Sequence, residues 1–168
     1  MLPDFSLNAA REDFRRARQQ AALQELMARL TGRSVDLLSY EDVRRKLRAT
    51  AIADRGLQEI PVSAVVGTVG RYGDFTRDFL PRDSVDEVRW ARVRMASEEK
   101  EAAGLPPIEV YKIGDAYFVR DGHHRVSVAR QMGVAHLTAS VTEVRTKVPL
   151  AADASPADTG PDPAEVAR

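Results

Sequence analysis

The sequence predicts an α+β fold in which helices pack on a small mixed sheet. Two short apolar runs, 108–112 and 116–119, flank Ile113-Gly114-Asp115 in the pattern of a tight β-hairpin. Apolar residues recur at three- to four-residue spacing over 9–31 and 84–97, which indicates amphipathic helices. The 168 residues are 43% hydrophobic, so the chain can bury the core of one domain.

Residues 1–58 are expected to form an N-terminal helical pair. The first helix covers 9–31 and ends at Gly32, because glycine is common just after a helix. The segment 11–18 within it is rich in arginine. This basic helix could contact a phosphate backbone, although a solvated charged face is the commoner explanation.

The second helix of the pair is expected over 40–50. Ser39 precedes it, and Asp42 follows three residues later, as in a capping box. Gly56 is expected to stop it. The segment 44–48 is basic, and it too could either contact a phosphate backbone or be a solvated charged face.

A second region, 59–148, is expected to hold the sheet. The segment 60–66 has the composition of a strand, and a glycine-punctuated loop follows over 67–75. Ser84, with Glu87 three residues later, predicts another capping box at the start of the next helix. The hairpin then continues into the most informative part of the chain.

The last elements follow the hairpin directly. A short helix over 126–132 closes at Gly133, and a final strand covers 137–144. From residue 149 onward the composition turns to Ala, Asp, Pro and Gly, with little to bury. The segment 149–168 is therefore expected to be a disordered acidic tail.

Composition excludes several classes of function. The chain has no cysteine, which rules out disulfides, thiolate metal sites and cysteine nucleophiles and fits a cytoplasmic setting. The 25 basic and 25 acidic residues cancel, so bulk charge gives no support to nucleic-acid binding. No signal peptide and no apolar run long enough to span a membrane is present, and no membrane partner is expected.

The main candidate site is Asp121-Gly122-His123-His124-Arg125, between a strand and a helix. A helix N-terminus presents unpaired N–H groups and partial positive charge, and glycine permits close approach of a ligand. Arginine can hold phosphate oxygens with a planar fork, and the imidazoles can donate or take a proton. Each residue alone has an ordinary explanation as a cap, a turn or a solvated charge. Together they predict an anion cradle.

Two further candidates lie in the glycine-rich loop. Arg71 could reach a phosphate, and Asp74 could act as a base or hold a metal, although an ordinary surface loop is at least as good an explanation. Asp121 could orient a histidine, cap the helix or hold Mg²⁺. A zinc site is not expected, because adjacent histidines project differently and no third ligand has a suitable spacing. His136 is expected to be a surface residue.

Residues 59–144 resemble, in order along the chain, the ParB N-terminal/sulfiredoxin-like superfamily. The resemblance rests on Ile60-Pro61-Val62, the Gly70-Arg71 loop, the helix 84–97, Pro107-Ile108-Glu109-Val110, Tyr117-Phe118-Val119-Arg120-Asp121-Gly122-His123-His124-Arg125 and Ala129. In ParB-type proteins the turn is Gly-Glu-Arg-Arg and binds nucleotide phosphates. Gly122 and Arg125 match it, and His123 and His124 replace the middle pair.

The same resemblance sets limits on the activity. Arg71 stands where ParB-type proteins carry a phosphate-contacting arginine, in a loop that departs from their Gln-Pro-Arg pattern. His123 stands where sulfiredoxins carry a catalytic cysteine, so sulfinic acid reductase activity is not expected. The Asp-Gly-His-His-Arg form also looks like archaeal free serine kinases, whose essential glutamate would correspond to Asp74.

Three functions follow from the resemblance. The first is a nucleotide-phosphate-binding domain that hydrolyses or transfers a phosphoryl group, with a nucleotide of CTP or ATP/ADP type, Mg²⁺, and Asp74, Asp121 or His123 as catalytic groups. The second is a ParB-type DNA-binding protein or nuclease, which would use the basic N-terminal helices. The third is a module that senses a nucleotide without chemistry.

Overall fold

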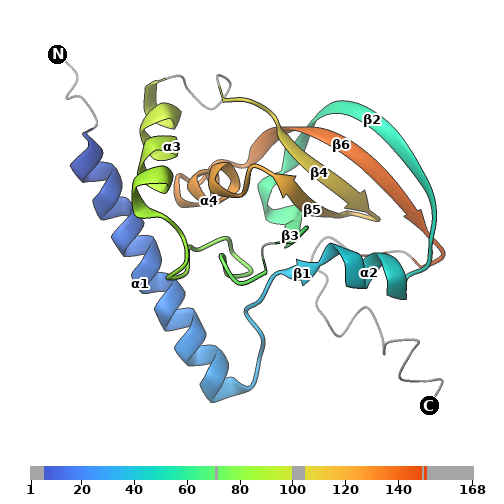
Figure 1. Cartoon of the computed structure of the whole chain (residues 1–168), viewed down its shortest axis with the longest axis horizontal. Coiled ribbons are helices and arrows are strands. Elements are labelled where there is room, and N and C mark those ends of the chain that lie inside the picture. Colours follow the sequence, from blue (N-terminus) through green and yellow to red (C-terminus); the bar gives the residue numbers. More distant parts are fainter. Residues whose placement is uncertain (1–5, 71, 100–104, 149, 151–168) are drawn as a thin grey trace.

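The computed structural model describes residues 6–70, 72–99, 105–148 and 150, and Figure 1 shows its arrangement. Within them the chain forms four α-helices, one 3-10 helix and a six-stranded sheet. The elements are α1 (Leu7–Thr31), β1 (Leu38–Ser39), α2 (Tyr40–Lys46), β2 (Ala49–Pro61), the 3-10 helix (Val62–Ala64), β3 (Val65–Thr68), α3 (Glu87–Glu99), β4 (Ile108–Ile113), β5 (Ala116–Asp121), α4 (His123–Gln131) and β6 (His136–Thr146). The expected α+β class with a mixed sheet is confirmed, with more strands than the sequence indicated.

The strands lie in the order β1-β3-β5-β4-β6-β2. β1, β3 and β5 run parallel to one another, so their carboxyl ends meet at one edge of the sheet. β4 and β5 form the predicted antiparallel hairpin, and β4 also pairs in parallel with β6. In sheets with parallel strands, ligands bind outside the carboxyl ends, so this topology directs attention to the ends of β3 and β5.

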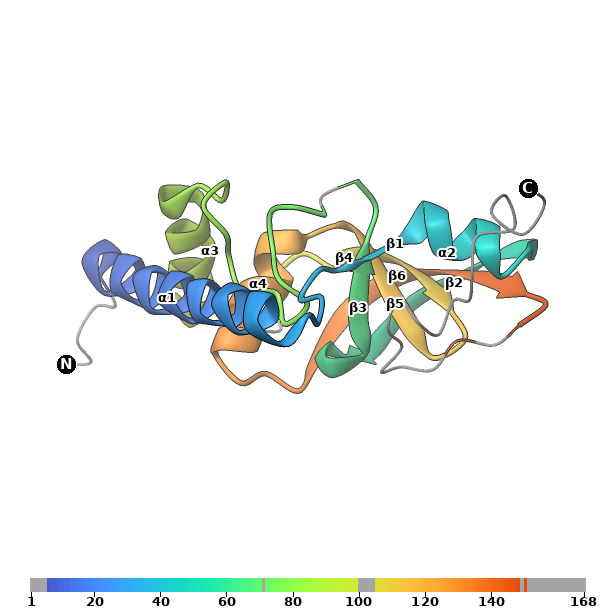
Figure 2. The ribbon, with the colours of Figure 1, turned by 90° about the horizontal axis from the view of Figure 1, so that it is seen from below.

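Helices cover both faces of the sheet. On one face, Phe14 of α1, Trp90 of α3 and Val126 of α4 belong to a large apolar cluster that includes Val119 of β5. On the other face, α2 packs over β3, β5 and the end of β6, with Phe118 fully buried. The molecule is elongated, with α1, α3 and α4 gathered at one end and α2 toward the other (Figure 2).

The two helices expected within residues 1–58 both form, but they do not pack against each other. α1 packs against α3, where the Phe14 and Trp90 rings lie 5.6 Å apart. α2 lies over the opposite face of the sheet, with Tyr40 stacked on Tyr111 at 4.3 Å. Each helix buries its apolar face against a different surface, and the extended segment between them carries the chain across.

The second helix is also shorter than expected. It ends at Lys46, and the chain then enters the long strand β2. Gly56 does not stop a helix; it lies at φ +67° beside a shift in the β2–β6 register, between the pairs of Asp54 and Leu57. Glycine takes this positive φ easily, as a β-bulge requires. The domain boundary expected after residue 58 falls inside β2.

The start of α3 differs from the predicted capping box. α3 begins at Glu87, and the Asp86 carboxylate accepts a hydrogen bond from the Arg89 amide at 2.8 Å. Asp86 is therefore the capping residue. The Ser84 hydroxyl instead donates to the Asp74 carboxylate at 2.8 Å.

Two predictions at the C-terminal end are confirmed in outline. α4 ends close to Gly133 at φ +71°, and β6 covers the expected final strand. Most of the tail expected over 149–168 lies outside the described residues. Leu150 within it is buried, and its carbonyl accepts a hydrogen bond from the Asp115 amide at 2.8 Å. No helix among the described residues is long and apolar enough to cross a membrane.

Candidate anion-binding site

The predicted turn lies where β5 passes into α4, at the carboxyl edge of the parallel strands. Gly122 takes φ +107° and is followed at once by the first residue of α4. A Cβ at this position would lie 2.5 Å from Ile108 Cγ2 and 2.9 Å from Ile108 Cβ. Glycine is therefore required both by the backbone angle and by the packing of β4 against the turn.

A cavity of about 230 Å³ opens at this turn. All five residues of the predicted turn, 121–125, line this cavity. Its remaining lining residues come from the end of β3, from α3 and from β5: Val69, Arg89, Val93 and Arg120. The first helical bond of α4 runs from the Val126 amide to the Gly122 carbonyl, so the preceding amides lie outside the helix's own ladder.

His123 is fixed inside the fold. Its side chain is buried, and Nε2 lies 2.6 Å from Thr68 Oγ1, at the end of β3. The ring stacks on Phe75 with 6.3 Å between centroids, and the His124 ring meets Phe75 edge-on at 5.7 Å. The two imidazole rings therefore contact Phe75 in different ways. The hydroxyl of Thr68 sets the orientation of the His123 imidazole.

Arg125 does not present an exposed fork. Its Nη1 donates to the Pro106 carbonyl at 2.6 Å and to the Pro107 carbonyl at 2.9 Å. Its Nη2 donates to Asp121 Oδ2 at 3.0 Å. Only 18% of the side chain is exposed. The guanidinium therefore fastens the segment before β4 to the start of α4, and its fork is not free for phosphate oxygens as the sequence predicted.

The predicted carboxylates are not gathered into one site. Asp121 is occupied by its ion pair with Arg125. Asp74 does not line the cavity, and its carboxylate accepts the Ser84 hydroxyl. Arg71 lies outside the described residues. No group of three His, Asp or Glu residues that could hold a metal ion is found among the described residues.

Two arginines that sequence reasoning missed face the cavity. Arg89 comes from α3, where the neighbouring Trp90 donates from Nε1 to Ser127 Oγ of α4 at 2.9 Å. Arg120 comes from β5, and its guanidinium carbon lies 6.0 Å from the centroid of the Tyr111 ring. Arg120 directly precedes the predicted turn and could have been included. Arg89 could not, since only the packing of α3 on α4 brings it there.

The basic segment of α1 is largely neutralised, but the basic segment of α2 is not. Arg11 and Arg15 both pair with Glu87 of α3, at 3.5 and 3.3 Å. Arg18 pairs with Asp83 at 2.8 Å, and Arg16 pairs with an aspartate one turn earlier in α1. In α2, Arg45 pairs with Asp42 at 3.1 Å. The α1 arginines are therefore engaged within the fold, whereas Arg44, Lys46 and Arg48 form no ion pair among the described residues.

Comparison of the chain with protein-family models and with curated proteins found no match. What this site can do therefore has to follow from its own geometry and charge.

Proposed function

We propose that the cavity at the start of α4 binds the phosphate end of a nucleotide. The observation that carries this proposal is the pair of arginines, Arg89 and Arg120, on its wall. Among the described residues, neither of them forms an ion pair with a carboxylate. Cations held at a cavity without an acidic partner favour an anionic ligand.

The charge of the lining supports an anion with more than one negative charge. Three arginines, Arg89, Arg120 and Arg125, stand against one carboxylate, Asp121, which leaves a formal charge of +2. The N-terminal end of α4 adds the partial positive charge of the helix dipole. A phosphate group would accept bonds from both sources.

The size of the cavity indicates which part of the ligand it would enclose. Its volume of about 230 Å³ lies below the roughly 300–1,000 Å³ of a pocket that surrounds a whole small ligand. One or two phosphate groups would fill it, and the sugar and base would then lie outside. Mg²⁺ would arrive with the nucleotide, bound by its phosphates.

Binding is the activity that these residues support best. A hydrolysis or transfer step would need a base beside the phosphate. His123 and His124 line the cavity, but Asp121 is already paired with Arg125 and Asp74 lies outside the lining. The proposed function therefore ends at recognition of the phosphates.

The test compares two arginines of the same helix by calorimetric titration with CTP, ATP and ADP, with and without Mg²⁺. Arg89 and Arg92 are both exposed on α3, and only Arg89 lines the cavity. Arg89→Gln should lose one charge-assisted bond of about 1.5–3 kcal/mol, which weakens binding roughly 10- to 150-fold. Arg92→Gln should bind as the wild type does. Equal affinities in the two variants, or no binding of any of these nucleotides, would refute the proposal.

A further inference from the structure

The second half of α1 carries an apolar stripe that faces away from the protein. The buried positions Ala10, Phe14, Ala17 and Ala21 lie along one side of the helix. Leu23, Leu26, Met27 and Leu30 fall on the opposite side, at the i, i+3, i+4, i+7 spacing of a helix-binding face. Their side chains are between 51% and 74% exposed. Single exposed apolar residues are ordinary, but four in one stripe indicate an interaction surface.

The charges beside this stripe have one sign. Arg29 and Arg33 are exposed at the end of α1, and in the described part of the chain neither has an ion-pair partner. The nearby acids are already engaged, since Arg82 pairs with Glu25 at 3.4 Å and with Asp36 at 2.7 Å. The surface therefore offers a partner apolar contacts flanked by two free cations.

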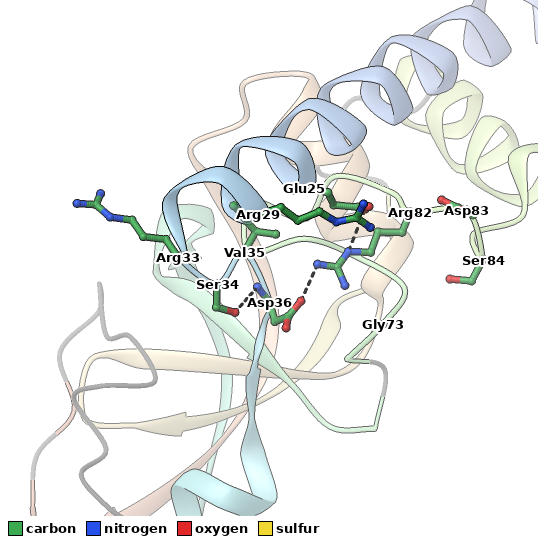
Figure 3. Close-up of a pocket in the computed structure, with 12 residues that line it drawn as sticks. Glu25, Arg29, Arg33, Ser34, Val35, Asp36, Gly73, Arg82, Asp83 and Ser84 are labelled. Atoms are coloured by element: carbon green, nitrogen blue, oxygen red, sulfur yellow. Dashed lines mark hydrogen bonds and ion pairs between the residues drawn. The ribbon is translucent and has the colours of Figure 1, made fainter.

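A hollow lies beside the end of α1, on a side of the helix where none of the four stripe residues lines it (Figure 3). It has a volume of about 760 Å³ and lies between the end of α1, the segment that follows it, and the loop before α3. Arg29 and Arg33 both line it, and Arg33 extends outward from the helix end. Arg29 and Arg33 therefore have open space around their side chains.

We propose that this surface, Leu23, Leu26, Met27 and Leu30 with Arg29 and Arg33, binds an acidic amphipathic helix of a partner protein. The stripe supplies the apolar contacts of helix-to-helix docking, and the two arginines select carboxylates on the incoming helix. A second copy of this chain fits less well, because its own stripe brings arginines and no acid to meet Arg29 and Arg33.

The test uses two synthetic helical peptides and the full chain. Both peptides carry leucines at every third or fourth position; one has glutamates between them, and the matched peptide has lysines instead. Fluorescence anisotropy should show binding of the glutamate peptide alone, weakened by added salt. Leu30→Gln should weaken it at least about tenfold, as the loss of one buried leucine predicts. Arg29→Gln and Arg33→Gln should each weaken it roughly two- to fivefold.

The control variant is Leu57→Gln, which changes a leucine that is 66% exposed on β2, away from α1, and should leave the affinity unchanged. Failure of the glutamate peptide to bind would overturn the proposal, as would equal binding of the lysine peptide. Sedimentation at increasing concentration identifies the other occupant. A dimer that Leu30→Gln abolishes would show that a second copy covers the stripe, and the proposal would then be wrong.

Discussion

Gly122→Ala should destabilise the protein far more than the same change at the other end of α4. At Gly122 the added Cβ meets two atoms of Ile108 at 2.5 and 2.9 Å, and Arg125 Cζ at 3.3 Å. Ile108 is buried in the core and cannot move away freely. At Gly133 the φ is also positive, +71°, but nothing lies within 4 Å of the added atom.

Alanine at either glycine carries the cost of a positive φ, and alanine at Gly122 carries the cost of a clash as well. A non-glycine residue at positive φ costs about 1–2 kcal/mol at either position. The clash with Ile108 should add about 1–3 kcal/mol at Gly122 alone. The smaller gain from restricting the unfolded chain is common to both variants and cancels in the comparison.

Urea unfolding of the two variants measures this difference directly. The free energy of unfolding of Gly122→Ala should fall about 1–3 kcal/mol below that of Gly133→Ala, and its melting temperature should be lower by roughly 2–4 °C per kcal/mol. Equal stability of the two variants would refute the reasoning. It would mean that the turn relaxes to accept a side chain, so that glycine is not required by packing.

The remaining predictions concern two arginines. Arg125→Ala should lower the free energy of unfolding by about 1–3 kcal/mol, since it leaves the carbonyls of Pro106 and Pro107 without their donor. If urea unfolding is unchanged, these hydrogen bonds do not contribute to stability. Arg55 donates to Glu143 at 2.8 Å, and this hydrogen bond holds the pKa of Glu143 below its usual range. A depressed carboxyl pKa contributes stability that is present above the ordinary pKa of glutamate and is lost as the pH falls through the folded value. In Arg55→Gln the Glu143 midpoint followed by NMR should rise, and a midpoint that stays in place would contradict this pairing.

Local signals in the sequence identified the elements that short-range chemistry controls. The β4–β5 hairpin, α4 and β6 follow from turn residues, helix periodicity and strand composition within a few positions of each other. Most of β2 was not predicted, because its strand conformation depends on pairing with β6, far along the chain. No nearby residue specifies that pairing, and Gly56 resembles a helix stop when it is a bulge.

The candidate site also combines residues that the local sequence identifies with residues that only tertiary packing brings there. Gly122, His123 and His124 were found because they are consecutive and sit between a strand and a helix. Arg125 was found too, but its bonds to Pro106 and Pro107 depend on how the segment before β4 lies. Arg89 enters only through the packing of α3, as does the neutralisation of the basic α1 segment by Glu87.

The pairing of β2 with β6 also determines when this protein can fold during synthesis. β2 ends at Pro61, but its partner begins at His136, the last strand of the described chain. At about 5–20 residues per second, a ribosome needs roughly 4–15 s to add the intervening 75 residues, 136 minus 61. During that time β2 has no partner strand, and its exposed Ile52 and Leu57 are open to other nascent chains. Pairing of β2 is therefore delayed until translation has passed β6, although β1, β3, β4 and β5 precede β6 and can pair before it.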